Sequence, residues 1–214
     1  MKTNIYAIVA IMLILIAGFS CHDNSGQPAS SFYYSSGEKV YLTQIADKIL
    51  LKFTPDADKE QILDIIGSDP SLKSMFDINL DENAALSTIV LETKNGKPVP
   101  PTTVEFFKSK TEVVSVTYLY QYNGQVLEGL TDEFVVKLKD STSFKQLQEL
   151  ADKNKCKIGD ENQFTKNQFM LYVSKTSKLN ALQTSNLFYE TGLFEYAEPN
   201  FYVFGGFSSL MFDN

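Results

Sequence analysis

The pattern of DKILLKF, residues 47–53, returns in the second half of the chain and gives the first indication of the fold. Its counterpart is DEFVVKL, residues 132–138. Both open with an acid and a second charged residue, and both carry a lysine at the same place. Apolar residues recur at every second position, which is the period of a β-strand with one buried face. The sequence therefore predicts an internal repeat of two units, each beginning with such a strand.

A helix signal follows each of these strands. Asp58 lies three residues before Gln61, and Ser143 lies three residues before Gln146, with apolar residues at helical spacing around each pair. This spacing is typical of a capping box, in which the cap side chain and the Gln side chain each accept a backbone N–H at the start of an amphipathic helix. We therefore expect a helix after the first strand of each unit.

The remaining segments also occur in pairs. Apolar runs of strand length lie at 86–93, 168–175, 111–122 and 191–202, and the last two align without gaps. The segments FDINLDEN and KIGDENQF are weaker candidates for a strand and turn. A second helix is expected in each unit, with Thr102 and Ser177 as its caps.

Each unit therefore has the order β-α-β-β-α-β. This is the ferredoxin-like order, in which an antiparallel four-stranded sheet carries two helices on one face. We predict an α+β protein with two tandem ferredoxin-like units, residues 40–124 and 125–204, followed by a C-terminal tail, residues 205–214.

The N-terminus reads as an export signal followed by a tether. An uncharged, almost wholly apolar run from Ile5 to Phe19 is shorter than the roughly 20 residues that span a bilayer and is typical of a signal peptide. Cys21 follows this run as in a bacterial lipoprotein cleavage site, which predicts a lipoprotein signal peptide at residues 1–21 and a lipidated Cys21. A secreted protein cut near Cys21, or an uncleaved anchor, stays open. Residues 22–39 are rich in Ser and Gly and are expected to form a flexible tether.

Composition and charge indicate a globular protein that does not bind nucleic acid. The chain has 214 residues, of which 43% are hydrophobic and 21% charged, which is ordinary for a globular protein. Its formal net charge is −7, and its lysines are scattered rather than clustered. Because nucleic acids are bound by clustered Lys and Arg, this distribution argues against nucleic acid as a partner.

Catalytic machinery is not visible in the sequence. The only histidine is His22, beside the expected anchor, whereas a Ser-His-Asp triad needs a positioned imidazole. No HExxH, paired CxxC or Gly-rich phosphate loop occurs. Cys156 lies between two lysines, which can lower a thiol pKa, but without a histidine base we interpret it as a buried or incidental residue. We predict a protein that is not an enzyme, with no catalytic residue, metal site or cofactor.

The end of the second unit carries a family resemblance. The β-α-β-β-α-β order ending in EYAEPNFY, residues 195–202, resembles the inhibitory prodomain of subtilisin-like serine proteases. The tandem arrangement, with FYYSSGEKVYL before the first strand, resembles the N-terminal pro-region of such proteases from Bacteroides-type bacteria. The resemblance covers about residues 32–204, and its most specific part is YAEPN at 196–200.

The resemblance implies a docking mode. In that family the prodomain's sheet packs across two parallel helices of the protease, and an acidic residue and an acceptor two positions on cap those helices. The matching positions are Glu198 and Asn200, separated by Pro199, which should sit at a strand edge or end because it cannot donate to a ladder. The alternative is that EPN is only a surface turn. The first unit lacks the motif, since Tyr118 and Tyr120 align with the two docking positions.

The resemblance also implies a role for the tail, which in that family enters the substrate groove of the protease. By their spacing from the motif, the expected groove residues are Val203, Phe204, Gly205 and Gly206. The leading hypothesis is a lipid-anchored protein of the cell envelope, periplasmic or surface-exposed, that binds and inhibits a subtilisin-like serine protease in trans, or assists its folding. The alternative is a non-enzymatic structural or adhesive surface lipoprotein that reuses the fold.

Overall fold

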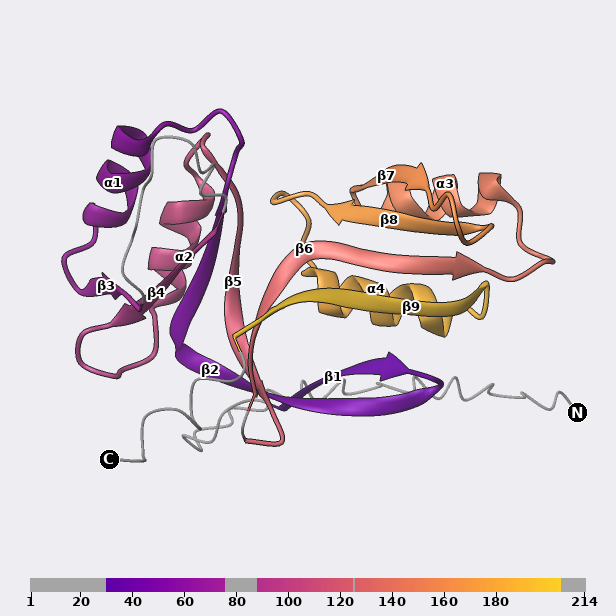
Figure 1. Cartoon of the computed structure of the whole chain (residues 1–214), viewed down its shortest axis with the longest axis horizontal. Helices are drawn as coiled ribbons and strands as arrows, with labels where there is room; N and C mark the ends of the chain where they lie inside the picture. The colour runs from indigo at the N-terminus through magenta and orange to yellow at the C-terminus, as the bar shows by residue number, and fades with distance from the viewer. Residues whose placement is uncertain (1–29, 76–87, 125, 205–214) are drawn as a thin grey trace, which may run out of the picture.

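The structure is a computed structural model that describes residues 30–75, 88–124 and 126–204. Within these ranges the chain is a mixed α/β protein with four helices and one nine-stranded sheet, and neighbouring strands pair antiparallel (Figure 1). The predicted class, helices combined with an antiparallel sheet, is confirmed at this level.

The same order of elements occurs twice. The first half contains β2 (Glu38–Phe53), α1 (Lys59–Gly67), β3 (Leu72–Ser74), β4 (Thr88–Thr93), α2 (Pro101–Lys108) and β5 (Val113–Tyr122). The second half contains β6 (Val126–Leu138), α3 (Phe144–Lys153), β7 (Cys156–Glu161), β8 (Gln168–Val173), α4 (Ala181–Glu190) and β9 (Phe194–Val203). The strands run β3-β4-β2-β5 in the first half and β7-β8-β6-β9 in the second, so corresponding strands hold corresponding places.

Local capping signals place two of the helices where the sequence predicts them. Asp58 and Ser143 each form a complete capping box, at the starts of α1 and α3. The caps expected for the other two helices are wrong. α2 begins at Pro101, whose missing N–H is not needed in a first turn. α4 is capped by Asn180 rather than Ser177, because Asn180 and Gln183 form the capping box. Residues 76–83, containing FDINLDEN, lie outside the described residues.

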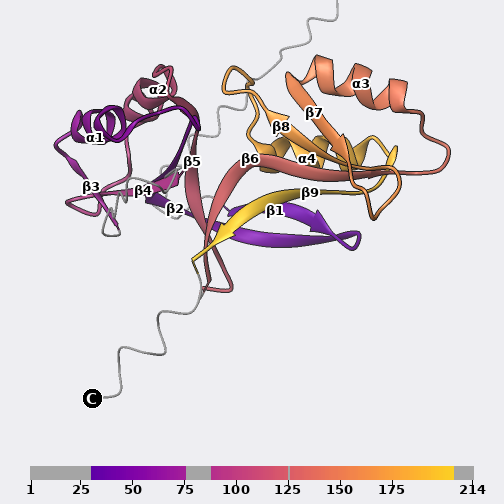
Figure 2. The same cartoon turned by 45° about the horizontal axis from the view of Figure 1, so that its top comes forward.

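Each half has its own helix-covered core. In the first half, side chains from β2, β4 and β5 pack against α1 and α2 around Phe53 and Phe107. In the second half, β6, β8 and β9 pack against α3 and α4 around Phe134 and Phe188. The helices of each half therefore cover one face of its strands. In Figures 1 and 2, α3 and α4 lie on the far side of β6 and β8, and the near side of these strands carries no helix.

A hairpin from the start of the chain completes the core of the second half. β1 (Ser30–Ser35) pairs with the beginning of β2, and this hairpin lies alongside β9 and α4 (Figure 1). Leu42 of β2 is 1% exposed and belongs to the second core, and the ring of Tyr33 lies 5.7 Å from that of Phe201. The expectation that residues 22–39 form a flexible tether is therefore wrong from Ser30 onward, because the aromatic residues there find buried partners in the second half.

Candidate functional site

The last strand does not end at the proline of the resemblance motif. β9 pairs with β6 on both sides of Pro199, which lies opposite Phe134, and the pairing continues to Val203 opposite Glu128. Of the two places expected for Pro199, a strand end is wrong and an edge strand is confirmed, since among the described strands β9 pairs only with β6. The docking end of the motif is thus an internal part of a continuous strand.

The register also corrects the alignment of the two units. Glu198 lies opposite Val135, the fourth residue of DEFVVKL, and the fourth residue of DKILLKF, Leu50, lies opposite Thr117. The counterpart of Glu198 is therefore Thr117 and not Tyr118. The gapless alignment of 111–122 with 191–202 is one residue out of register at this point.

Asn200 has no counterpart in the first unit. Tyr118 and Leu119 are consecutive partners of β2, whereas their equivalents Pro199 and Phe201 are separated by Asn200 at a register shift between β9 and β6. At this shift β6 has three residues, 131–133, between the partners of Phe201 and Pro199, whereas β9 has only Asn200. Such a mismatch is a β-bulge, which turns side chains out of the regular alternation. The pairing of Asn200 with Tyr120 in the alignment is therefore wrong as well.

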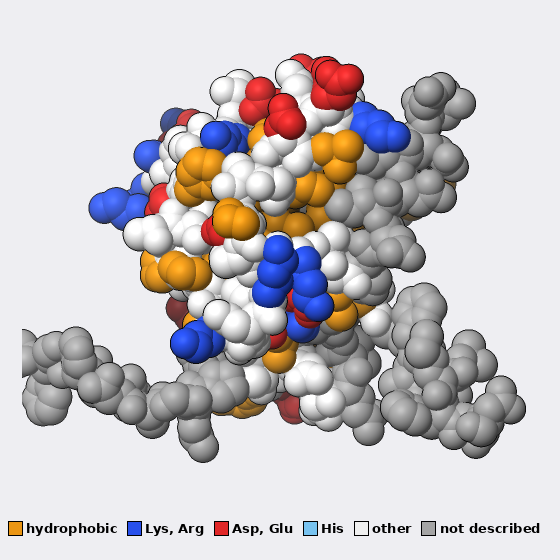
Figure 3. Space-filling view, turned by 90° about the vertical axis from the view of Figure 1, so that its left-hand side faces the viewer, with side chains coloured by type: hydrophobic (Ala, Val, Ile, Leu, Met, Phe, Trp, Pro, Cys, Tyr) orange, Lys and Arg blue, Asp and Glu red, His pale blue; other side chains and the backbone are white. Residues whose placement is uncertain are grey.

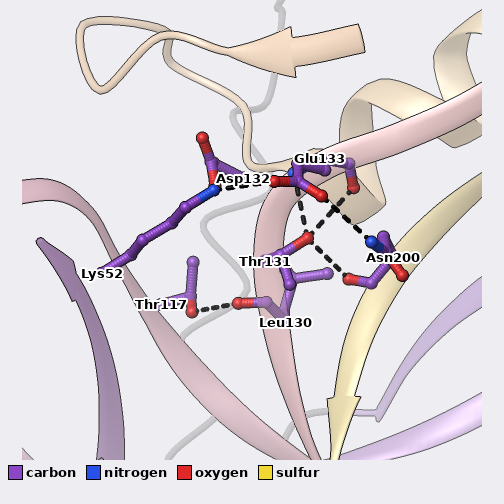
Figure 4. Close-up of polar contacts among 7 residues, drawn as sticks. All are labelled: Lys52, Thr117, Leu130, Thr131, Asp132, Glu133 and Asn200. Carbon is purple, nitrogen blue, oxygen red and sulfur yellow. Dashed lines mark hydrogen bonds and ion pairs between the residues drawn. The ribbon is translucent and has the colours of Figure 1, made fainter. Parts of the chain in front are cut away.

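The bulge directs Asn200 into a polar cluster at the joint between the halves (Figure 4). Asn200 Nδ2 donates a 3.0 Å hydrogen bond to Glu133 Oε2, and the Thr131 hydroxyl donates to the Asn200 carbonyl at 2.9 Å. Asn200 Oδ1 accepts the backbone N–H of Phe201 at 3.1 Å. The predicted acceptor group of Asn200 is therefore already engaged within the chain.

The cluster continues into the first half through a lysine. Lys52 Nζ lies 2.7 Å from Asp132 Oδ1 and 2.7 Å from Glu133 Oε1, with side-chain exposures of 18%, 6% and 21%. Burial alone would lower the pKa of Lys52, but its hydrogen bonds to Asp132 and Glu133 outweigh burial and raise it. Lys52 occupies the position at which both repeats carry a lysine. Its second-unit counterpart, Lys137, pairs instead with Glu195 at 3.1 Å.

In the second half, Glu198 lies on the opposite side of the sheet from the helices. Its neighbours Ala197 and Pro199 are buried and Ala197 belongs to the helix-side core, so alternation turns Glu198 to the other face. Glu198 is half-buried, and its carboxylate makes no hydrogen bond or ion pair with the described residues. A carboxylate in this setting is available to accept a donor from a partner.

We call the helix-free side of the second half the open face, and its central residues come from β6, β8 and β9. Its members are Val135, Lys137, Met170, Tyr172, Tyr196 and Glu198. Tyr172 is exposed and the others are half-buried. Sequence reasoning singled out only Glu198 here, although the alternation of the strands already separated these residues from the core.

The side formed by α1 and α2 has a different character. Hydrophobic, basic and acidic side chains are interspersed on it (Figure 3). Phe106 is partly exposed beside Lys110, whose ammonium lies 4.3 Å from its ring centre, and Lys108 pairs with Glu105 at 3.0 Å. Single exposed apolar residues among charges are normal for a protein surface.

The predicted groove residues divide between described and undescribed parts of the chain. Val203 is 63% exposed at the end of β9, while Phe204 packs against Leu50, Val90 and Leu119 of the first half. Gly205, Gly206 and the predicted lipidation site Cys21 lie outside the described residues.

Other chemistry is limited in the part of the chain that the structure describes. Cys156 is buried, and burial raises the pKa of its thiol to about 11, which supports the interpretation of an inert cysteine. Across residues 30–75, 88–124 and 126–204, no three His, Cys, Asp or Glu side chains are placed to hold a metal ion. Nor is any helix in these ranges long and apolar enough to cross a membrane.

Comparison with known proteins adds no family: no protein-family model and no curated protein matches the chain.

Proposed function

We propose that this chain is a lipid-anchored, prodomain-like protein of the cell envelope that binds and inhibits a subtilisin-like serine protease in trans, or assists its folding. The observation that carries the proposal is the open face, on which the Glu198 carboxylate has no partner among the described residues. The residues that would act are non-catalytic, and the complex needs no cofactor.

We further infer that the two halves are tandem ferredoxin-like units. The support is their shared β-α-β-β-α-β order and the matching strand orders β3-β4-β2-β5 and β7-β8-β6-β9. In such a unit the two helices cover one face, so the other face is left for a partner. The second half follows this arrangement with the open face.

The composition of the open face suits a partner's helices. Val135, Met170, Tyr172 and Tyr196 present apolar and aromatic surface, which is typical of the centre of an interface. Helix N-termini carry unsatisfied N–H donors and partial positive charge. The unpaired carboxylate of Glu198 is a suitable acceptor for them, and such a contact is charge-assisted.

The geometry changes the roles within the motif. Because Asn200 Oδ1 already accepts from Phe201 and its amide donates to Glu133, Glu198 carries the capping role and Asn200 orients the strand. Val203, Phe204, Gly205 and Gly206 remain the proposed groove residues, with Val203 the most exposed of the described pair.

The test uses a soluble chain without the signal peptide and Cys21, residues 22–214, and a panel of subtilisin-like proteases. Inhibition of peptide hydrolysis and calorimetric binding are measured at micromolar concentration, and the refolding yield of denatured protease is measured with and without the chain. Inhibition without a gain in refolding identifies an inhibitor, and the converse identifies a folding assistant. If the chain neither binds any protease of the panel nor improves its refolding, the proposal is contradicted.

A separate measurement addresses the anchor. Mass spectrometry of the mature protein from membranes is expected to show a diacylated Cys21, because two acyl chains are needed for stable anchoring. An unmodified N-terminus downstream of Cys21 would contradict this part alone.

One observation favours the alternative, a structural or adhesive surface protein. The β1–β2 hairpin presents a row of aromatic rings: Tyr41 is 61% exposed, its ring lies 6.0 Å from that of Phe32, and Phe32 lies 5.6 Å from Tyr34. If the protein binds no protease and Tyr41→Ala abolishes adhesion, the function is that of an adhesive surface protein.

A further inference from the structure

The first half has a buried apolar cluster on the side away from its helices. We call it the joint cluster; it consists of Leu50, Val90 and Leu119, one residue from each of β2, β4 and β5. Their neighbours Ile49, Leu51, Ile89 and Leu91 belong to the helix-side core, so alternation turns the joint cluster to the opposite face. Apolar side chains buried on a helix-free face must be covered by another part of the chain.

The last described residue of the chain helps to bury this cluster. Phe204, the residue that follows β9, packs against the joint cluster together with Ile45 and Met75. The pairing of β9 with β6, which continues to Val203 opposite Glu128, brings Phe204 to this place. The contact thus links the last strand of the second half to the sheet of the first.

A glycine makes room for this contact. A Cβ at position 129 would lie 2.9 Å from Phe204 Cε2 and 2.9 Å from Leu50 Cδ2, which is closer than carbon atoms approach. Gly129 does not have a positive φ, so a turn does not require glycine there. Glycine inside a strand often marks a close approach of another group, and here the group is the pair of Phe204 and Leu50.

We propose that the helix-free face of the first half is a docking site for the chain's own C-terminal segment, with Phe204 as its first docked side chain. The sequence that follows supports a segment built for apolar contact, since Phe207, Leu210, Met211 and Phe212 lie within the last ten residues. The docking is a property of the chain itself and does not rest on the proposed function.

A consequence for inhibition does rest on the proposed function. The same segment cannot occupy the joint cluster and a protease groove at once, so the docked state competes with groove binding. Loosening the contact is then expected to strengthen inhibition, whereas Phe204 itself is needed in the groove. Variants of residues that contact Phe204 separate release of the segment from loss of a groove residue, because they leave the tail sequence unchanged.

The chain contains no tryptophan, so a single introduced tryptophan reports its own surroundings. In the chain of residues 22–214, Phe204→Trp is expected to emit at shorter wavelength and to resist acrylamide quenching. Val203→Trp is the matched control, because Val203 is 63% exposed and is expected to give the solvent-exposed signal. Equal emission and equal quenching of the two variants would overturn the proposal.

A second pair of variants tests the site itself. Gly129→Ala, placed in the Phe204→Trp background, is expected to shift the emission and the quenching toward those of Val203→Trp. Gly67→Ala is its control, because a Cβ there meets nothing within 4 Å. If Gly129→Ala does not fold by circular dichroism, Leu50→Ala replaces it with the same expectation. A folded cluster variant that leaves the Phe204→Trp signal unchanged contradicts docking at this site.

The protease readout keeps the two proposals apart. The tryptophan contrast is measured without protease, so it stands even when no protease is bound. Where a protease is inhibited, Gly129→Ala with the native Phe204 is expected to lower the inhibition constant. An unchanged inhibition constant would contradict the competition between docking and groove binding, but it would not contradict the docking itself.

Discussion

Asn200 and Glu133 face each other across β9 and β6, and the Asn200 amide donates a 3.0 Å hydrogen bond to the Glu133 carboxylate. The other oxygen of that carboxylate lies 2.7 Å from Lys52 of the first half. One carboxylate therefore joins the bulge beside Glu198 to the strand that opens the first repeat. The first half does more than pack beside the second, since it supplies the cation that holds this part of β9.

Removal of that cation is expected to destabilise the fold. Lys52→Met leaves Asp132 and Glu133 without their ammonium partner, and the expected loss is roughly 1.5–3 kcal/mol, the range for hydrogen bonds to charged groups. Lys73→Met is the matched control, because Lys73 pairs with Glu92 at 3.0 Å but is 54% exposed, and exposed pairs contribute about 0–1 kcal/mol. Urea unfolding of both variants measures the difference in unfolding free energy. Equal losses would show that the Lys52 cluster contributes no more than an exposed ion pair.

The contribution of Lys52 is expected to disappear in alkali. Burial lowers the pKa of Lys52, but its hydrogen bonds to Asp132 and Glu133 raise it above the ordinary 10.5. A folded-state pKa above the unfolded one gives stability that is complete below 10.5 and is lost as pH rises through the folded-state value. The difference in unfolding free energy between wild type and Lys52→Met should therefore be constant at neutral pH and shrink in alkali. A difference that persists would assign the effect to packing.

The hairpin of the first half is expected to stabilise the second. Leu42→Ala removes a fully buried side chain from the second core, and such substitutions cost about 2–5 kcal/mol. Tyr41→Ala, at the adjacent and 61% exposed position, is the control and should change stability little. Hydrogen exchange of α4 and β9 measures the effect where it should occur. Unchanged protection there would mean that the hairpin is dispensable.

The remaining thiol is expected to be unreactive in the folded state. Burial raises the pKa of Cys156 from 9.0 to about 11, so little thiolate forms at slightly alkaline pH. In a Cys21→Ser chain, Cys156 is the only cysteine, and a disulfide reagent should label it slowly until denaturant is added. Fast stoichiometric labelling of the native protein would contradict its burial.

The docking role of Glu198 makes a sharp prediction under the proposed function. Glu198→Gln keeps the shape and removes the charge, and the loss of one charge-assisted contact on the order of 1–3 kcal/mol raises the inhibition constant roughly ten- to hundredfold. Stability should not fall, because the Glu198 carboxylate has no hydrogen bond or ion pair among the described residues. Glu195→Gln, which removes the partner of Lys137 on the same strand, is the control. Equal constants for both variants would exclude Glu198 as the docking residue.

Local pattern alone determined much of the fold. The alternation in 47–53 and 132–138 predicts the first strand of each half, and the capping boxes of Asp58 and Ser143 predict the starts of two helices. These features depend on residues close in sequence, whose spacing selects a strand period or a helix cap. The absence of a histidine base already favoured a buried or incidental Cys156 over a reactive one, and Cys156 is buried.

The way in which the halves meet and the course of the last strand depend on contacts between distant parts of the chain. The bulge at Asn200, the pairing of Lys52 with Asp132 and Glu133, and the packing of Phe204 on Leu50 all join residues far apart in the sequence. A slip of one residue turns every side chain of a strand to the other face. The register of β9 therefore depends on its partner β6, and not on the order of residues around Pro199.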